Sequence, residues 1–291
     1  MKKIFALLGL LAASPAFSAD DPYLWLEEVQ SPAALDWVRA RNAQTLDLLE
    51  KQPQYKSFYK TALDLSNDKD RIPYASFRGG YFYNFWQDEK HVRGMWRRAT
   101  QAEYLAKNPR WETLLDVDAL AKKEKENWVY KGADCLPPDY DRCLVSLSRG
   151  GKDAVVTREF DVPSRSFVKG GFFIPESKSD GAWLDRDTLL VSDATDPVLN
   201  TDSGYPRIVR RLKRGGELAK SEIVFTGEKT DVSARGFAIF RPEGSYPLLT
   251  RAKSFFEAEI YLLKPDGSRS KLRFPDDASF SGFFRGYALA S

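Results

Sequence analysis

The chain has 291 residues, with 44 Lys and Arg against 41 Asp and Glu and one His, which gives a formal net charge of +3 at pH 7. This length fits one large domain or two modest ones, and a hydrophobic fraction of 43% is ordinary for a chain that builds a sizeable core. So small a net charge does not argue for nucleic-acid binding.

The first 18 residues, Met1 to Ser18, are typical of an export signal. Lys2 and Lys3 form a basic start, residues 4–13 an apolar core, and residues 16–18 a small-x-small cleavage site. The apolar run is too short to span a bilayer, and no later stretch approaches that length. We therefore expect a periplasmic or secreted protein with no membrane association after the signal is removed.

Residues 19–68 are predicted to form a helical lead-in. Ser31 and Pro32 give a helix start, because a hydroxyl can cap free amides and proline is favoured at the first helical position. Two helices are expected, over residues 31–50 and 53–65. Each carries a mostly apolar stripe at helical spacing that needs a partner surface, formed by Leu35, Val38, Asn42, Leu46 and Leu49 and by Tyr55, Phe58, Ala62 and Leu65.

From residue 72 onward the apolar period changes from helical to two, which is typical of strands. Residues 74–78 and 81–86 are predicted to form a hairpin around Gly79-Gly80, since a diglycine supplies the positive φ angles of a tight turn. Further strands are expected near residues 95–99, 111–115, 144–147, 154–160, 166–168, 188–191, 208–212, 222–225, 235–240, 246–250, 258–264 and 271–274.

The strands recur with a regular period. Comparable ones begin near Leu144, Leu189 and Phe237, a spacing of roughly 45 to 50 residues that matches a four-stranded β-propeller blade. The predicted fold class is therefore mainly β: residues 69–291 form an incomplete β-propeller of about four four-stranded blades after the helical segment. Strands without interleaved helices exclude a doubly wound sheet.

Segments spread from Asp21 to about Phe240 share residue types and spacing with one known family. They are Asp21-Pro22-Tyr23, Trp25-Leu26-Glu27, Trp37-Val38 with Asn42, and residues 83–87, 111–116, 126–128, 144–151 and 203–207. On these segments the chain resembles the prolyl oligopeptidase family of serine peptidases. The resemblance implies a helical lead-in, a seven-bladed propeller and an α/β-hydrolase domain beyond it. Since only about four blades fit here, we expect the N-terminal portion of a longer protein, without the catalytic domain.

No residue is predicted to be catalytic. Serine hydrolysis needs an activated hydroxyl, a base and a group that orients the base. An α/β-hydrolase holds its serine in a G-x-S-x-G elbow, which the sequence lacks. The single histidine, His91, is interpreted as a solvent-facing residue of a charged loop over residues 87–93. Neither a Gly-rich phosphate loop nor a metal-ligand cluster occurs in the sequence, so no cofactor and no metal are predicted.

Two basic features favour structural interpretations. Arg-Gly-Gly occurs at Arg78, Arg149 and Arg214, and hairpin turns explain it better than RNA-binding boxes do. The basic stretch over residues 207–214 alternates with apolar residues, which favours a solvated strand face over a substrate-facing patch.

Cys135 and Cys143 are the only cysteines. In an oxidising compartment they could form a disulfide across the turn-forming residues 136–140, and we favour this over two free thiols. A zinc site is not expected, because two cysteines and one distant histidine cannot supply four ligands at the usual spacing.

For the complete enzyme, the resemblance implies hydrolysis of short peptides, often after proline. The propeller would limit access to a serine, aspartate and histidine on the missing domain. The expected partners are therefore short peptides and that α/β-hydrolase domain, and the chain alone should be inactive.

The alternatives are a stand-alone periplasmic propeller that binds without catalysis, and a degenerate gene remnant. The reading frame beyond Ser291 would separate the three.

Overall fold

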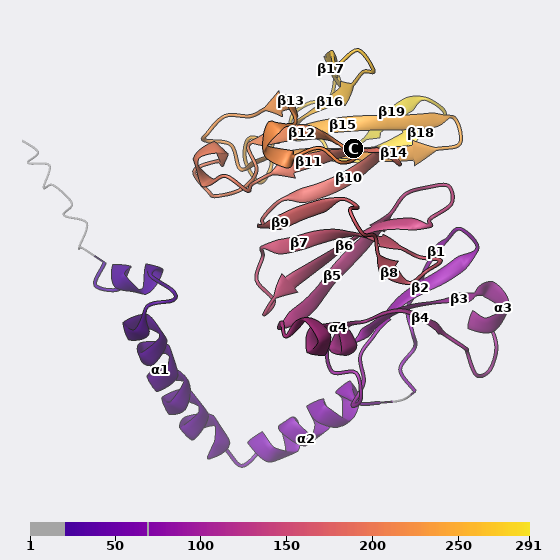
Figure 1. Ribbon diagram of the computed structural model, residues 1–291. Helices are drawn as coiled ribbons and strands as arrows, with labels where there is room; N and C mark the ends of the chain where they lie inside the picture. Colours follow the sequence, from indigo (N-terminus) through magenta and orange to yellow (C-terminus); the bar gives the residue numbers. More distant parts are fainter. Residues whose placement is uncertain (1–20, 69) are drawn as a thin grey trace, which may run out of the picture. The chain divides into compact units, whose positions relative to one another are not determined.

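The computed structural model describes residues 21–68 and 70–291 (Figure 1). The predicted export signal, residues 1–18, lies outside the described residues. The chain divides into two compact units, one ending at Asp68 and one beginning at Lys69. The first unit is helical, and the second consists mainly of antiparallel sheets.

The helical unit contains a 3-10 turn, η1 (Leu24–Glu27), and two helices, α1 (Pro32–Glu50) and α2 (Tyr55–Ser66). Helix α1 begins as predicted, because the N–H of Ala34 donates a hydrogen bond of 3.2 Å to Ser31 Oγ. Helix α2 begins at Tyr55 rather than at residue 53, since Tyr55 N–H donates to the carbonyl of Gln52 and closes a turn there.

Aromatic contacts fix the lead-in to α1, and much of the apolar surface of α1 and α2 is exposed. The ring of Trp37 lies 6.0 Å from that of Tyr23 and 6.3 Å from that of Trp25. Many large apolar side chains of the two helices are exposed, among them Val38, Leu46, Leu48, Leu49, Phe58, Tyr59, Leu63 and Leu65. This unit therefore presents an apolar surface.

Over residues 70–291, the second unit contains five sheets that follow one another in sequence (Figure 1). The first consists of β1 (Ser76–Arg78), β2 (Tyr81–Trp86), β3 (Met95–Thr100) and β4 (Glu112–Asp116). The second consists of β5 (Trp128–Cys135), β6 (Arg142–Arg149), β7 (Val155–Asp161) and β8 (Ser166–Phe167), with β9 (Phe173–Ser177) also paired to β7.

The remaining sheets repeat this pattern. The third consists of β10 (Asp180–Asp185), β11 (Thr188–Asp193), β12 (Ile208–Lys213) and β13 (Glu222–Thr226). The fourth consists of β14 (Ser233–Arg241), β15 (Gly244–Ala252), β16 (Ala258–Leu263) and β17 (Arg269–Lys271). A two-stranded sheet of β18 (Phe280–Phe284) and β19 (Tyr287–Ala290) follows.

Three buried apolar clusters join the four larger sheets in succession. The first two sheets share one that includes Tyr83, Trp96, Trp128, Val145 and Phe160. The second and third share Leu144, Ile174, Trp183 and Leu189, and the third and fourth share Leu190, Val209, Ala234 and Leu249. Four-stranded antiparallel sheets packed face to face after an N-terminal helical segment confirm the predicted mainly β propeller fold.

Gly236 shows how closely the third and fourth sheets approach. A Cβ at this position would lie 2.6 Å from Val209 Cγ1 and 3.1 Å from Leu190 Cβ. Its N–H donates a hydrogen bond of 3.0 Å to Ser192 Oγ. Only glycine therefore fits at this point of β14 without displacing its neighbours.

Several element predictions are wrong. Strands β5 and β10 were not predicted, because β5 carries polar residues and a bulge between Tyr130 and Gly132 that breaks the apolar alternation. Two short helices, α3 (Gln101–Tyr104) and α4 (Val117–Glu124), interrupt the strands that were expected to have no helices between them. Strand β17 is Arg269–Lys271 rather than residues 271–274.

The solvated strand face predicted for residues 207–214 is also wrong. Strand β12 is mostly buried, and Arg210 is only 7% exposed. Arg210 Nε donates to Asp193 Oδ2 at 2.6 Å, and Asp193 is itself buried. The ion pair offsets the cost of burying both charges. An alternation of charged and apolar residues in the sequence cannot reveal that such a partner is present.

Candidate functional site

The first strand of each of the four larger sheets contributes to one cavity of about 580 Å³. It is lined by the charged residues Arg78, Asp134, Asp180 and Arg235 and by the aromatic residues Tyr140, Trp183, Phe237 and Phe240. A cavity of this size with apolar walls and a few charged groups is typical of a binding site for a small ligand. We call it the inner-strand cavity.

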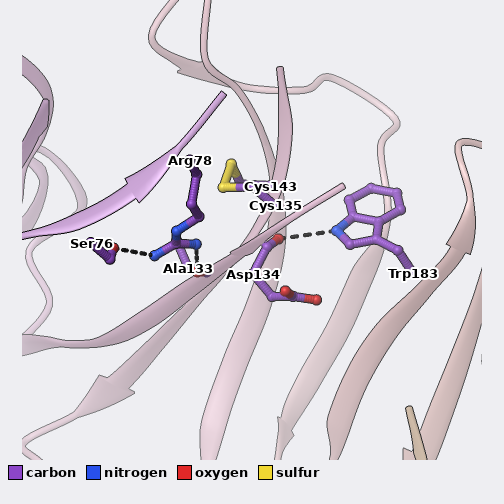
Figure 2. Close-up of a disulfide and its surroundings, with 7 residues drawn as sticks. All are labelled: Ser76, Arg78, Ala133, Asp134, Cys135, Cys143 and Trp183. Atoms are coloured by element: carbon purple, nitrogen blue, oxygen red, sulfur yellow. Dashed lines mark hydrogen bonds between the residues drawn. A yellow bond between two sulfur atoms is a disulfide. The ribbon is translucent and has the colours of Figure 1, made fainter. Parts of the chain in front are cut away.

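Arg78 enters the cavity from the end of β1. Its Nη1 donates to the carbonyl of Ala133 at 3.4 Å and its Nη2 to Ser76 Oγ at 3.0 Å (Figure 2). Its guanidinium group also lies over the ring of Tyr83. Both hydrogen-bond acceptors are neutral, so these contacts fix the position of the cation without neutralising it.

Asp134, near the end of β5, supplies a carboxylate to the same cavity. Its main-chain carbonyl accepts a hydrogen bond of 3.0 Å from Trp183 Nε1, while its carboxylate points away from the guanidinium of Arg78 (Figure 2). The surrounding protein displaces solvent and raises the pKa of this carboxyl group, and the charge of Arg78 opposes that effect. Among the described residues, none forms a hydrogen bond or ion pair with this carboxylate.

The second pair of charges in the cavity is already neutralised. Arg235 Nη1 on β14 donates to Asp180 Oδ2 on β10 at 2.7 Å, and both side chains are about half exposed, at 48% and 51%. This ion pair connects the third and fourth sheets at the cavity wall, and its exposure limits its stabilising effect.

The two cysteines lie beside the cavity and are joined by a disulfide. Cys135 and Cys143 face each other across the β5–β6 hairpin, with an S–S distance of 2.00 Å and a Cα–Cα distance of 3.9 Å. Both are buried, and Cys135 is among the residues that line the cavity. The bridge therefore closes the loop of residues 136–142 next to Asp134 (Figure 2).

The disulfide-bridged loop also places an aromatic ring in the cavity wall. Tyr140, at a φ of 53°, donates its N–H to the carbonyl of Leu136 at 2.9 Å. Its ring packs so closely on Gly79 that a Cβ there would lie 2.8 Å from Tyr140 Cδ2. Gly79, at a φ of 51°, thus meets both the turn geometry and the packing requirement.

His91 lies away from the cavity, in the loop between β2 and β3. Its Nδ1 is 3.0 Å from Asp88 Oδ1, and its side chain is 33% exposed, so it is half-buried rather than fully solvent-facing. Partial burial acts against the ionisation of Asp88, but hydrogen bonds from His91 and Lys90 outweigh it and lower the Asp88 pKa. The geometry accounts for His91 as part of a loop structure.

Within residues 21–68 and 70–291, no group of three or more His, Cys, Asp or Glu side chains is placed to hold a metal ion. No helix in the described part of the chain combines the length and apolar character needed to cross a membrane.

The sequence did not predict the charged residues of the inner-strand cavity. Arg78 was interpreted only as part of a turn, and Asp134, Asp180 and Arg235 were not singled out. Each lies on the first strand of a different sheet, and only the packing of the sheets brings them together. A usable signal was the presence of a charged residue on each of these first strands.

Comparison with known proteins identifies relatives over most of the chain. Residues 14–273 match the family model described as the prolyl oligopeptidase N-terminal β-propeller domain. Two curated relatives are an uncharacterized peptidase of Sinorhizobium fredii, 42% identical over 277 residues, and one of Rickettsia prowazekii, 30% identical over 278 residues. These alignments cover 93% and 91% of this chain but only 38% of either relative.

A solved structure gives the same relationship. The post-proline cleaving enzyme from Rickettsia typhi is 30% identical and superimposes with a TM-score of 0.84, over 91% of this chain and 40% of that one. The present chain therefore spans about two fifths of the length of the proteins that it matches.

Proposed function

The chain belongs to the prolyl oligopeptidase family as the N-terminal β-propeller region of such a peptidase, and from this premise we propose that it controls which peptides reach a catalytic domain. That α/β-hydrolase domain would lie outside these 291 residues and carry the serine, aspartate and histidine. The substrates proposed for the whole enzyme are short peptides, cleaved after proline as the name of the Rickettsia typhi relative describes for that protein.

The observation that carries this proposal is the inner-strand cavity. Four strands from four sheets meet around about 580 Å³, with fixed charges and aromatic walls. Such a space accepts an extended short peptide, whereas a folded protein domain is far too large for it. Selection by size would therefore follow from the packing of the sheets.

The exposed helical surface supports a second part of the proposal, a docked catalytic domain. Phe58 is 70% exposed and Leu65 is 64% exposed on α2, and Leu46 and Leu49 are about half exposed on α1. Several exposed large apolar side chains on two neighbouring helices are typical of a protein–protein interface. We propose that this surface packs against the α/β-hydrolase domain.

We also propose export to the periplasm or the exterior. The basic and apolar pattern of residues 1–18 supports this, and so does the Cys135–Cys143 disulfide, because disulfides persist in oxidising compartments. Mass determination of the N-terminus of protein recovered from a periplasmic extract tests it; an uncleaved N-terminus on cytosolic protein would contradict it.

The activity proposal is tested first with the chain alone. Residues 19–291 should not hydrolyse a chromogenic prolyl peptide, and no fluorophosphonate label should attach to them. Turnover that persists through purification and that a fluorophosphonate blocks would contradict the assignment of catalysis to another domain.

Access control is tested in the chain joined to the catalytic domain that the proposal requires. Ala238→Trp narrows the inner-strand cavity, since Ala238 lines it. We expect kcat/KM to fall more for peptides of ten or so residues than for a chromogenic dipeptide. Ile223→Trp, at a half-exposed position on the outer strand β13, is the matched control. An equal effect of Ala238→Trp on both substrates would overturn the access role.

The alternative is a stand-alone periplasmic propeller that binds a ligand without catalysis. It would use the same cavity but gives no reason for the exposed apolar residues of α1 and α2. The coding sequence after Ser291 decides between the two: a frame that continues to a G-x-S-x-G elbow supports the peptidase, and a stop codon supports the binding module. A frameshift before hydrolase-like sequence would instead indicate a gene remnant.

A further inference from the structure

The inner-strand cavity contains two opposite charges that do not pair with each other. The guanidinium of Arg78 donates to two neutral acceptors, and the carboxylate of Asp134 forms no hydrogen bond or ion pair in the described part of the chain. The neighbouring Asp180 and Arg235, by contrast, form an ion pair of 2.7 Å. Arg78 and Asp134 are therefore charges left available in a cavity where other charges are matched.

Local structure keeps these two charges apart. Arg78 is held by Ala133 on β5 and by Ser76 on its own strand, and its position is further fixed by the ring of Tyr83. The backbone of Asp134 is held by the indole of Trp183, and its carboxylate points away from Arg78 (Figure 2). In this arrangement the two side chains form no ion pair with each other.

Arg78 is half-buried and Asp134 is exposed at the wall of a concave space, where a charge gains more from a pairing partner than it does in open water. A ligand that carries one positive and one negative end would satisfy both residues at once. The aromatic rings of Trp183, Phe237 and Phe240 offer apolar surface for what lies between its two ends.

We propose that the inner-strand cavity binds short peptides with two free termini, the ammonium group at Asp134 and the terminal carboxylate at Arg78. The choice of peptides as the ligand class rests on the proposed function, and the selection for free termini rests on the two unpaired charges. The cavity would thus distinguish zwitterionic short peptides from longer or blocked ones of similar composition.

The test is titration calorimetry of residues 19–291 with the tripeptide Ala-Ala-Pro and with its N-acetylated and C-amidated forms. We expect blocking either terminus to raise Kd roughly tenfold, the size expected for the loss of one charge-assisted contact. In the Asp134→Asn variant, acetylation of the peptide should change Kd less than about twofold, because the charge that contacts the ammonium group is already gone. In the Arg78→Met variant, amidation of the peptide should likewise change Kd less than about twofold. Arg78→Lys should retain most of the discrimination against the amide.

Asp153→Asn is the matched control, because Asp153 is exposed and lies outside the cavity; it should bind all three peptides as the unmodified chain does. Equal affinity for free and blocked peptides, or no binding by folded protein at millimolar peptide, would overturn the inference. The three peptides alone decide the question if a variant fails to fold. The calorimetry measures binding and does not need catalysis. Failure of the Ala238→Trp experiment would therefore count against the proposed access role, whereas equal binding of free and blocked peptides would count against the present inference.

Discussion

Arg214 and Glu159 form a two-pronged ion pair between the third and second sheets, 55 residues apart in sequence. Arg214 Nη1 lies 2.7 Å from Glu159 Oε2 and Nη2 lies 3.1 Å from Oε1, and the Glu159 side chain is only 1% exposed. Glu159 Oε2 also accepts the N–H of Phe172 at 2.9 Å. The hydrogen bonds that Arg214 donates to Glu159 raise the pKa of Arg214, which therefore stays charged between the two sheets.

Arg214→Met is expected to destabilise the propeller region strongly, because it leaves the buried Glu159 carboxylate without its charge partner. We expect a loss of about 2–4 kcal/mol in the free energy of unfolding, measured by urea denaturation. Adding Glu159→Gln should recover part of that loss, since the second substitution removes the stranded charge.

Arg211→Met on β12 is the control for this pair. Arg211 binds Glu222, whose side chain is 58% exposed, so its loss should cost less than about 1 kcal/mol. Similar losses for Arg214→Met and Arg211→Met would mean that the buried pair contributes no more than a surface one.

Removal of the Cys135–Cys143 disulfide should lower stability without unfolding the chain. The bridge closes a loop across a sequence separation of 8, and the chain-entropy model gives about 2–3 kcal/mol for so short a loop. We expect this difference in urea denaturation between the oxidised chain and a variant with both Cys135→Ala and Cys143→Ala. A reducing agent should destabilise the former and leave the variant unchanged; equal sensitivity would show that the bridge does not form in solution.

Local features of this fold could be predicted from sequence because neighbouring residues determine them. The cap at Ser31 follows from side-chain chemistry within one turn of helix. The turns at Gly79-Gly80 and Gly150-Gly151 follow from the ability of glycine to adopt positive φ, as all four residues do. The period of the strands likewise indicated a propeller.

The candidate site could not be predicted in the same way. Arg78, Asp134, Asp180 and Arg235 come from four sheets, and no local pattern records which strands line a common space. The burial of Arg210 was missed for a related reason, since its partner Asp193 lies on another strand. A charged residue is predicted to be exposed unless the residue that neutralises it is known.

Glu259 on β16 should make the fourth sheet sensitive to acid. Hydrogen bonds from Lys271 and Tyr261 lower the pKa of Glu259 from 4.5 to about 2. Partial burial opposes this shift, and a hydrogen bond from Lys253 adds to it. The pKa of Glu259 is lower in the folded chain than in the unfolded chain. The ionised Glu259 carboxylate therefore stabilises the fold fully above pH 4.5, and this stabilisation is lost as the pH falls toward 2. Allowing for screening by water, we expect Glu259→Gln to cost about 1–2 kcal/mol at neutral pH.

The measurement is the free energy of unfolding of Glu259→Gln and of the unmodified chain from pH 7 to pH 2. The difference between the two should shrink as the pH falls. Glu257→Gln, at an exposed position before the same strand, should show no such trend. A difference that is independent of pH would assign the effect to packing rather than to charge.

Phe58→Gln should separate the stability of the chain from its association with a catalytic domain. Phe58 is 70% exposed on α2, so its replacement should change the free energy of unfolding by no more than about 0.5 kcal/mol. If this surface packs against the α/β-hydrolase domain, burial of a Phe side chain there is worth roughly 1.5–3 kcal/mol, and the variant should bind that domain at least about tenfold more weakly.

Lys56→Gln, at an exposed polar position on the same helix, should leave the affinity unchanged. Separately expressed domains and surface plasmon resonance give the measurement. Unchanged affinity for Phe58→Gln would place the interface elsewhere than on α2, and a large loss of stability would show that Phe58 belongs to the core of the chain itself.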